Sequence, residues 1–217
     1  MSAVLTPPRS VPVAAPPAPA VVTPPPVAQL PPQPFRWTLG EYYDLDRIGF
    51  FHERRTMLLD GVIYVMPNPN PPHSTALTLV DAWSRTAFGP GNVVRVQMPF
   101  DILSDTEPNP DLAVVAGSPR DFAVANPTTA RLIVEVADSS LFLDTTTKAE
   151  KYATAGVPEY WVIDLEHRLL LVFRDPVPLP QGLGATAYRT HRTLTETDSV
   201  SPLAAPGTTI RVADLLP

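Results

Sequence analysis

The sequence predicts a mixed α/β (α+β) fold, in which helices flank a mixed β-sheet. Apolar runs of strand length recur along the chain, and residues 132–137 form the strongest of them. A helical pattern lies between this run and the next one, at 159–165, as expected for a crossover between parallel strands. The 217 residues, 44% of them apolar, suit one domain with an appendage.

The appendage is residues 1–34, which differ in composition from the rest of the chain. They are almost all Pro, Ala, Val, Thr and Gln, and Arg9 is the only charged side chain. Proline removes backbone donors and fixes φ, so neither a helix nor a sheet can propagate. We predict an extended, largely disordered Pro-rich tail, either a spacer or a docking segment, followed by a folded domain at 35–217.

Capping and turn signals place the first elements of the domain. Thr38 and Glu41 form the pattern of a capping box for a helix over 39–48. Asp60 and Gly61 predict a hairpin turn or a bulge between two extended pieces, the second a strand covered on both faces.

Periodicity and turn residues predict the remaining elements. They are a helix over 73–88, a strand over 93–103 continuing past Pro99, a strand over 112–117, an irregular segment 118–130 with a turn of helix, a strand over 132–137, a helix over 145–155 with Asp144 as N-cap, strands over 159–165, 169–173 and 188–194, a loop over 176–184, and an apolar C-terminal fragment over 210–216.

Composition excludes several classes of protein. The net charge of −6 argues against a broad basic surface for nucleic acid, although a local basic cleft stays open. The absence of cysteine rules out disulfides and thiolate metal sites. No run of apolar residues is long enough for a membrane span, and no signal-peptide pattern opens the chain. A soluble cytoplasmic protein without a membrane partner is therefore expected.

Two carboxylates next to apolar strands suggest a site. Asp111 opens a predicted strand, and Glu135 lies within a strand that could pair beside it. Burying a carboxylate is costly unless something compensates it, and a Mg²⁺ ion would do so. The backbone carbonyl of Val136 could be a further ligand, and the ammonium of Lys148 could orient a metal-activated hydroxide.

Structural explanations stay open for the same residues. Asp111 could cap a turn, Glu135 could pair with a buried base, and Lys148 could be a solvated helix residue.

Four segments together resemble the Uma-two family of restriction endonucleases, a branch of the PD-(D/E)XK nuclease superfamily. They are MLLDGVIYVMPNPNPPH, NPDLAVV, LIVEVADSS and DTTTKAEKYATAGVPEYWVID, and the resemblance covers about residues 36–195. It implies a restriction-endonuclease-like fold with a mixed sheet of four or five strands between helices. Superfamily members often act as dimers, so the resemblance also makes a homodimer an expectation.

The resemblance assigns roles residue by residue. Asp111 matches the aspartate of the Pro-Asp motif, and Glu135 matches the acidic residue of (D/E)XK. Ala137 stands where the superfamily usually has lysine. Lys148 with Tyr152 fits the family's displaced lysine and the tyrosine four residues after it.

The implied activity is a Mg²⁺-dependent, or Mn²⁺-dependent, DNA endonuclease. His73 stands where the family often has histidine, and it could touch a phosphate or simply face solvent. Met57 replaces the glutamate that the family usually has before Asp-Gly. That departure favours the alternative of a catalytically impaired protein that keeps the fold as a binding or assembly module. A metal-dependent hydrolase with a substrate other than nucleic acid is a third reading.

Overall fold

The computed structural model describes residues 33–179 and 186–217. The chain divides into two units, Met1–Pro34 and Phe35–Pro217, and the second is described here. The predicted disordered tail lies almost entirely outside the described residues, so it stays a prediction. No helix among the described residues has the length and apolar character that crossing a bilayer requires.

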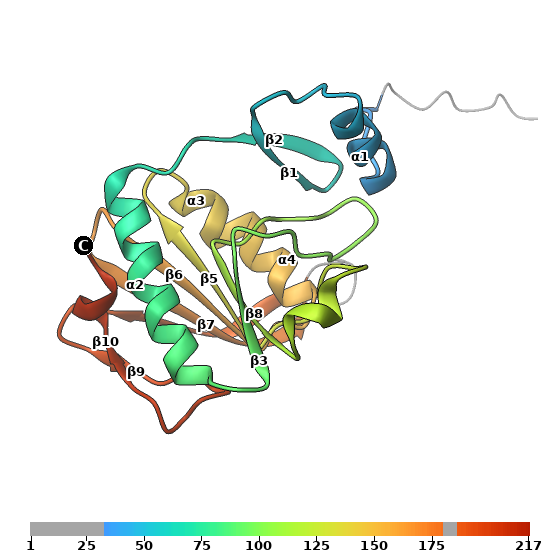
Figure 1. Ribbon diagram of the computed structural model, residues 1–217. Helices are drawn as coiled ribbons and strands as arrows, with labels where there is room; N and C mark the ends of the chain where they lie inside the picture. Colours follow the sequence, from blue (N-terminus) through green and yellow to red (C-terminus); the bar gives the residue numbers. More distant parts are fainter. Residues whose placement is uncertain (1–32, 180–185) are drawn as a thin grey trace, which may run out of the picture. The chain divides into compact units, whose positions relative to one another are not determined.

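A six-stranded mixed sheet forms the centre of the domain and confirms the predicted fold class (Figure 1). Its strands, in spatial order, are β3 (Asn92–Val96), β4 (Leu112–Ala116), β5 (Leu132–Ala137), β6 (Glu159–Asp164), β7 (Leu169–Pro178) and β8 (Thr186–Leu194). Only β5 and β6 pair in parallel, and the other neighbours are antiparallel. The sheet thus has more strands than the four or five that the resemblance implied.

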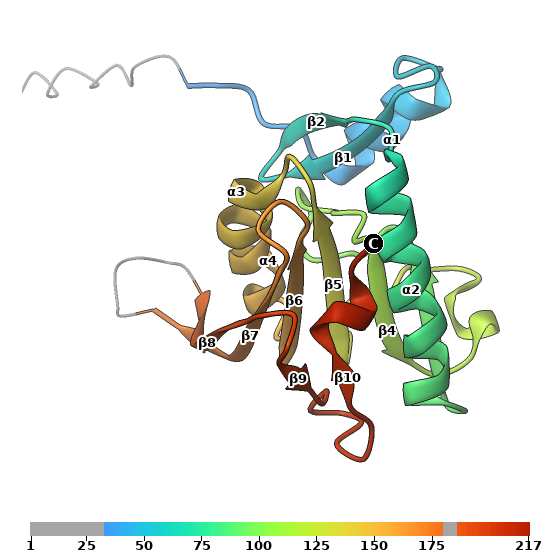
Figure 2. The same cartoon turned by 90° about the vertical axis from the view of Figure 1, so that its left-hand side faces the viewer.

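Helices cover the two faces of this sheet, as Figures 1 and 2 show. The helix α2 (Pro71–Phe88) packs on one face together with the C-terminal segment. That segment contains β9 (Ser199–Val200), β10 (Ile210–Arg211) and the 3₁₀ turn Val212–Leu215. The crossover helix between β5 and β6 covers the other face.

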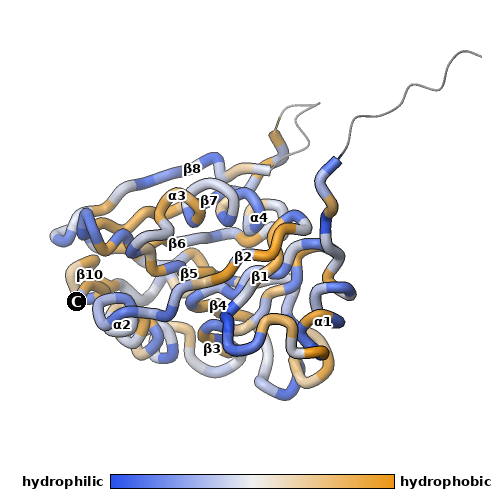
Figure 3. Tube along the Cα trace, turned by 90° about the horizontal axis from the view of Figure 1, so that it is seen from above, coloured by the Kyte–Doolittle hydropathy of each residue, from blue (hydrophilic) through white to orange (hydrophobic). Residues whose placement is uncertain are grey.

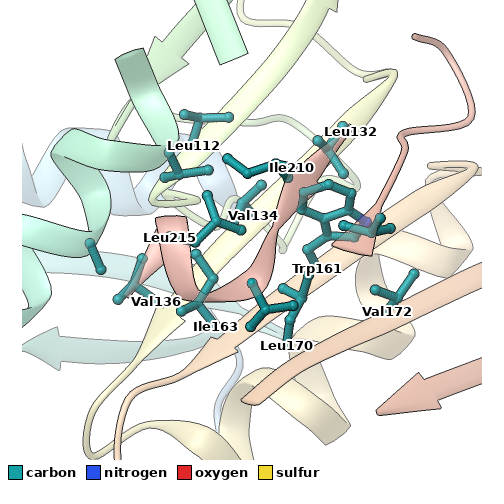
Figure 4. Close-up of a cluster of buried hydrophobic side chains, with 14 of the residues drawn as sticks. Leu112, Leu132, Val134, Val136, Trp161, Ile163, Leu170, Val172, Ile210 and Leu215 are labelled. Atoms are coloured by element: carbon teal, nitrogen blue, oxygen red, sulfur yellow. The ribbon is translucent and has the colours of Figure 1, made fainter. Parts of the chain in front are cut away.

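Strand alternation gives each face its own apolar cluster. Leu112, Val134 and Trp161 point to the α2 side (Figure 4). On that side Trp161 stacks on Trp83, with ring centroids 5.7 Å apart. The intervening residues of the same strands point to the crossover helix, and Ile133 and Tyr160 are among them. The strands β4, β5 and β6 are therefore buried on both sides, which explains their continuous apolar runs.

A separate hairpin, here called the ribbon, consists of β1 (Arg55–Leu59) and β2 (Val62–Met66). The predicted turn is confirmed, because Asp60 and Gly61 both have positive φ, 49° and 68°. A side chain at Gly61 would lie 2.7 Å from Cβ of Arg36, so glycine is required there.

The ribbon packs on α1 (Leu39–Arg47) through a small cluster of Tyr42, Phe51 and Leu58. Helix α1 starts at the predicted capping box of Thr38 and Glu41. The expectation that β2 is covered on both faces is wrong. Val65 is 61% exposed, because the ribbon is only two strands wide and stands outside the main sheet.

Strand prediction failed at two further places. Strand β3 ends at Val96 rather than continuing past Pro99, because Gln97 adopts a left-handed conformation with φ 51° and Pro99 has no amide to donate. Strand β7 extends to Pro178 and so includes the start of the predicted loop at 176–184. Residues 180–185 of that loop lie outside the described ranges.

The crossover helix begins earlier than the sequence indicated. It runs without interruption through α3 (Leu141–Leu143), a π-helical turn (Asp144–Lys148) and α4 (Ala149–Thr154). Asp144 is therefore inside the helix and does not cap it. Its side chain is 1% exposed, and this burial has a consequence for the site.

Candidate active site

A pocket of about 420 Å³ lies where the sheet, the start of α2, the crossover helix and the ribbon meet. All three acidic and basic residues singled out in the sequence, Asp111, Glu135 and Lys148, line it. So do Val136 and His73, whereas Tyr152 lies below the pocket, fully buried. The ribbon supplies Arg55, Tyr64, Val65 and Met66 to one wall.

Asp111 and Glu135 lie side by side because β4 and β5 are antiparallel neighbours. Leu112 pairs with Val134 in the antiparallel register. Asp111, just before β4, therefore lies opposite Glu135, the residue after Val134. The amide of Asp111 donates to Oε2 of Glu135 over 3.3 Å. The amide of Val136 donates to Oδ2 of Asp111 over 2.9 Å. Each carboxyl group is thus held by a backbone amide of the neighbouring chain segment, the one that carries the other acid.

Two further side chains hold the carboxylate of Asp111. Nε2 of His73 lies 3.1 Å from Oδ2, and Nε2 of Gln97 donates to Oδ1 over 3.0 Å. Burial raises the pKa of Asp111, but His73, the Val136 amide and Gln97 outweigh it, so the pKa lies below its ordinary value. An ionised carboxylate only accepts, so Nε2 of His73 must carry the proton in this contact.

His73 is positioned by the first turn of α2. The side chain of Asn70 caps the helix by accepting from the His73 amide over 3.1 Å. The same side chain donates to Oδ2 of Asp138, which follows β5, over 2.7 Å. The start of α2 is thereby tied to the end of the strand that carries Glu135. His73 thus faces Asp111 and is not a solvent-facing helix residue.

Glu135 meets Lys148 and Tyr152 from the crossover helix. Oε1 of Glu135 lies 3.1 Å from Nζ of Lys148, and it accepts from the Tyr152 hydroxyl over 2.6 Å. Lys148 and Glu135 are each only 2% exposed. Ala137 is buried in the cluster under α4, and the lysine reaches Glu135 from the helix. Lys148 is not the solvated helix residue that one reading of the sequence allowed.

Asp144 is the site neighbour that sequence reasoning missed. Its Oδ1 lies 2.8 Å from Nζ of Lys148, and its Oδ2 accepts from Oγ of Ser140 over 2.5 Å. The acid stands four residues before the lysine, a spacing typical of ion pairs on a helix. That spacing is the signal the sequence offers, whereas the prediction of Asp144 as an N-cap is wrong because the helix begins earlier. Gln97, which contacts Asp111, is a second neighbour that was not predicted, and no residue spacing in the sequence indicates it.

The ionisable cluster carries more negative than positive charge. Burial, together with the charges of Asp144 and Asp111, raises the pKa of Glu135 to about 8 against the opposing charge of Lys148. Burial lowers the pKa of Lys148, but Glu135 and Asp144 more than reverse that effect, so the lysine stays charged. Three carboxyl groups thus share one buried ammonium.

This excess charge and the available donors fit a divalent cation. Oδ1 of Asp111 and Oε2 of Glu135 each have one hydrogen-bond donor among the described contacts, and a carboxylate oxygen has two lone pairs. No group of three or more His, Asp or Glu side chains suited to a metal occurs in residues 33–179 and 186–217. Mg²⁺ commonly uses only one or two carboxylates and completes its shell with other oxygens.

Met57 lies on the pocket side of the ribbon but is not part of the pocket lining. It pairs with Tyr64 across the ribbon, and paired residues of a hairpin share a face. Tyr64 lines the pocket, whereas Met57 beneath it is fully buried. An apolar side chain therefore stands where the family usually has an acid.

Comparison with known proteins agrees with this architecture. The model of a family described as "Uma2: Putative restriction endonuclease" matches residues 39–213. The chain belongs to the Uma2 family. No curated protein matches the chain. A solved structure described as "a putative nuclease belonging to DUF820" from Anabaena variabilis superposes on this Uma2 chain with a TM-score of 0.65. It is 19% identical, and the match covers 82% of this chain and 96% of that one.

Family and fold together are those of nucleases. The family covers both the ribbon and the sheet, since its match begins at the start of α1 and ends within the C-terminal 3₁₀ turn. The solved structure, at its low identity, supports the fold alone.

Proposed function

We propose that this Uma2 chain is an endonuclease that hydrolyses phosphodiester bonds of DNA with Mg²⁺ or Mn²⁺. The observation that carries the proposal is the placement of Asp111 and Glu135 on adjacent strands, in one pocket with a buried Lys148. Buried ionisable groups with shifted pKa values that converge in a pocket are typical of catalytic sites.

In this proposal the carboxylates of Asp111 and Glu135 and the carbonyl of Val136 hold the metal. A bound Mg²⁺ supplies a water of lowered pKa and offsets the negative charge that develops on the phosphodiester. His73 and Gln97 hold Asp111 in its orientation through the hydrogen bonds to its two oxygens. The metal would also supply the positive charge that the cluster lacks.

Lys148 is proposed to orient the attacking water with its ammonium. Its Nζ lies between Asp144 and Glu135, which keeps the side chain extended toward the pocket. Tyr152 donates to the same oxygen of Glu135 and so fixes the carboxylate that the lysine contacts. A charged lysine acts here by position and charge, because its raised pKa makes it a poor base.

The test is incubation of purified protein with supercoiled plasmid and single-stranded DNA, with Mg²⁺ or Mn²⁺. We expect the wild type to cut and the Asp111→Asn and Lys148→Ala variants to lose most activity. Asp164→Asn is the matched control, because Asp164 is a buried acid paired with His167 and does not line the pocket. Intact DNA in every reaction over a broad set of substrates would remove the nuclease proposal.

Met57 favours a second candidate, a catalytically impaired nuclease fold that binds or assembles. A fully buried methionine stands at residue 57, where the resemblance implies a glutamate, so the ribbon offers no acid to the pocket from this position. DNA binding that is unaffected by Asp111→Asn, with no cleavage by the wild type, would support this candidate. The homodimer and the cytoplasmic location stay predictions.

A further inference from the structure

We infer that the pocket accepts an unpaired nucleic-acid strand, and that intact duplex is a poor substrate. The inference rests on the proposed function and deepens it by naming the substrate class. It comes from the enclosure of the site, the chemistry of the pocket walls and the small number of free cations in them.

The proposed catalytic groups lie deep below the surface. Glu135 and Lys148 are 2% exposed, and the side chain of Asp111 is 13% exposed. The ribbon closes one side of the pocket through Tyr64 and Met66. A volume of about 420 Å³ falls in the range of pockets for small molecules. One nucleotide fits such a space, whereas a scissile phosphate in a duplex arrives with its base pair and the second strand.

The pocket walls suit a nucleobase better than a phosphate backbone. Tyr64, Val65 and Met66 from β2 and Leu143 from α3 line the pocket, together with several amide side chains. Most of β2 is coloured as hydrophobic in Figure 3, whereas most of β8, at the edge of the main sheet, is coloured as hydrophilic. Bases stack on aromatic side chains whatever their sequence, and Tyr64 is the aromatic residue of this lining.

Exposed apolar residues occur on two of the elements that contribute to the pocket lining. Phe142 of α3 is 80% exposed and directly precedes Leu143, which lines the pocket. Val65 of the ribbon is part of the lining and is 61% exposed. A strand that leaves the pocket could cover these residues with its neighbouring bases.

Free cations are scarce around the pocket. Among its described lining residues the cationic ones are Arg55 and Lys148, and Lys148 is engaged by Glu135 and Asp144. Duplex binding depends strongly on many phosphate contacts from lysine and arginine. Stacking on bases must therefore supply more of the affinity here, and the faces of the bases are free for stacking only in an unpaired strand.

The experiment compares binding of one fluorescein-labelled oligonucleotide in two states, single-stranded and annealed to its complement. Fluorescence anisotropy is measured on the full-length Asp111→Asn protein, which is expected to lose most cleavage activity. We expect the single strand to bind about tenfold more tightly or better. The double variant Asp111→Asn with Tyr64→Ala should lose about tenfold in single-strand affinity, as loss of one stacking contact implies.

Phe50→Ala, in the same background, is the control for the loss of an aromatic side chain outside the pocket. Phe50 is 58% exposed and does not line the pocket, so its variant should bind as the parent does. Equal or tighter duplex binding overturns the inference, and so does the absence of single-strand binding. Indifference of single-strand binding to Tyr64→Ala overturns it as well.

The two proposals fail separately. If the wild type nicks duplex plasmid as fast as it cuts single strands, the endonuclease stands and the inference falls. If the single strand binds through Tyr64 but no DNA is ever cut, the endonuclease falls and the strand-binding pocket stands.

Discussion

Nζ of Lys148 lies 2.8 Å from Oδ1 of Asp144, one turn earlier in the same helix, and both side chains are almost fully buried. Asp144 does not line the pocket, so it would act on the reaction only through the lysine. The π-helical turn that spans these two residues places both side chains beside Glu135. Such turns are rare and occur often at functional sites.

The Asp144→Asn variant should lower kcat by about 10- to 100-fold with little change in KM, because the ammonium loses the partner that orients it. Steady-state cleavage of a single-stranded oligonucleotide measures both constants. Asp144→Glu should restore part of kcat, which a purely structural defect would not predict. A variant that cuts like the wild type would show that Asp144 has no positioning role.

Two buried glutamates should respond oppositely to replacement by glutamine. Glu159 is fully buried and accepts from Trp161 Nε1, from Arg174 and from the Leu203 amide. Glu159→Gln leaves Arg174 without its charge partner, so the free energy of unfolding should fall by about 3 kcal/mol. Urea unfolding measures this loss, which should not depend on Mg²⁺.

Glu135→Gln should instead stabilise the metal-free protein at high pH. The folded pKa of Glu135 is raised to about 8. Its stabilising contribution is therefore present at low pH and is lost as pH rises through that value. Glutamine resembles the protonated form, so the variant should match the wild type at about pH 5 and exceed it at about pH 9. Urea unfolding without metal at both pH values is the measurement, and a variant less stable at high pH would contradict the assignment.

Mg²⁺ affinity should rise with pH for the same reason. Below about pH 8 the metal has to displace the proton of Glu135, whose pKa burial raises to about 8. Between about pH 6 and about pH 8 the affinity should then rise by no more than roughly tenfold per pH unit. Above about pH 8 it should level off. Calorimetric titration in two buffers of different ionisation enthalpy counts the released proton. Constant affinity across this range, or no proton release, would argue against Glu135 as a ligand.

Met57→Glu tests whether the missing acid limits the site. A carboxylate at this fully buried position should lower the free energy of unfolding by about 3 kcal/mol or more without metal. Mg²⁺ should recover part of that loss, because the position shares the pocket face of the ribbon with Tyr64. The control Met57→Leu should cost less than about 1.5 kcal/mol. A loss that Mg²⁺ leaves unchanged would place residue 57 outside the metal's reach.

Local signals predicted most of the fold. The capping box at Thr38, the turn at Asp60-Gly61 and the apolar run of β5 all depend on neighbouring residues, and each is confirmed. The end of β3 was missed because Gln97 carries no turn signal. Its left-handed conformation accompanies contacts with Asp111, fourteen residues away, whose carbonyl accepts from the Gln97 amide over 3.0 Å.

The sequence predicted those members of the candidate site that belong to recognisable motifs. Asp111, Glu135, Val136, Lys148 and His73 share one pocket, although their catalytic roles stay a proposal. Tyr152 contacts Glu135 from below. Asp144 and Gln97 could not be assigned from the sequence, because their roles depend on side-chain partners in three dimensions. A buried acid inside a helix and an acid at its start look alike until the helix boundary is known.

The ribbon has an apolar cluster of its own, formed with Tyr42 and Phe51 of the N-terminal part of the domain and separate from the two clusters of the main sheet. It nevertheless provides a wall of the pocket through Tyr64 and Met66. If the proposed function holds, a substitution at Tyr64 or Met66 is expected to change substrate binding while the hydrogen bonds between the strands that position Asp111 and Glu135 stay in place. The pocket wall and the proposed metal ligands thus belong to parts of the domain with separate apolar clusters.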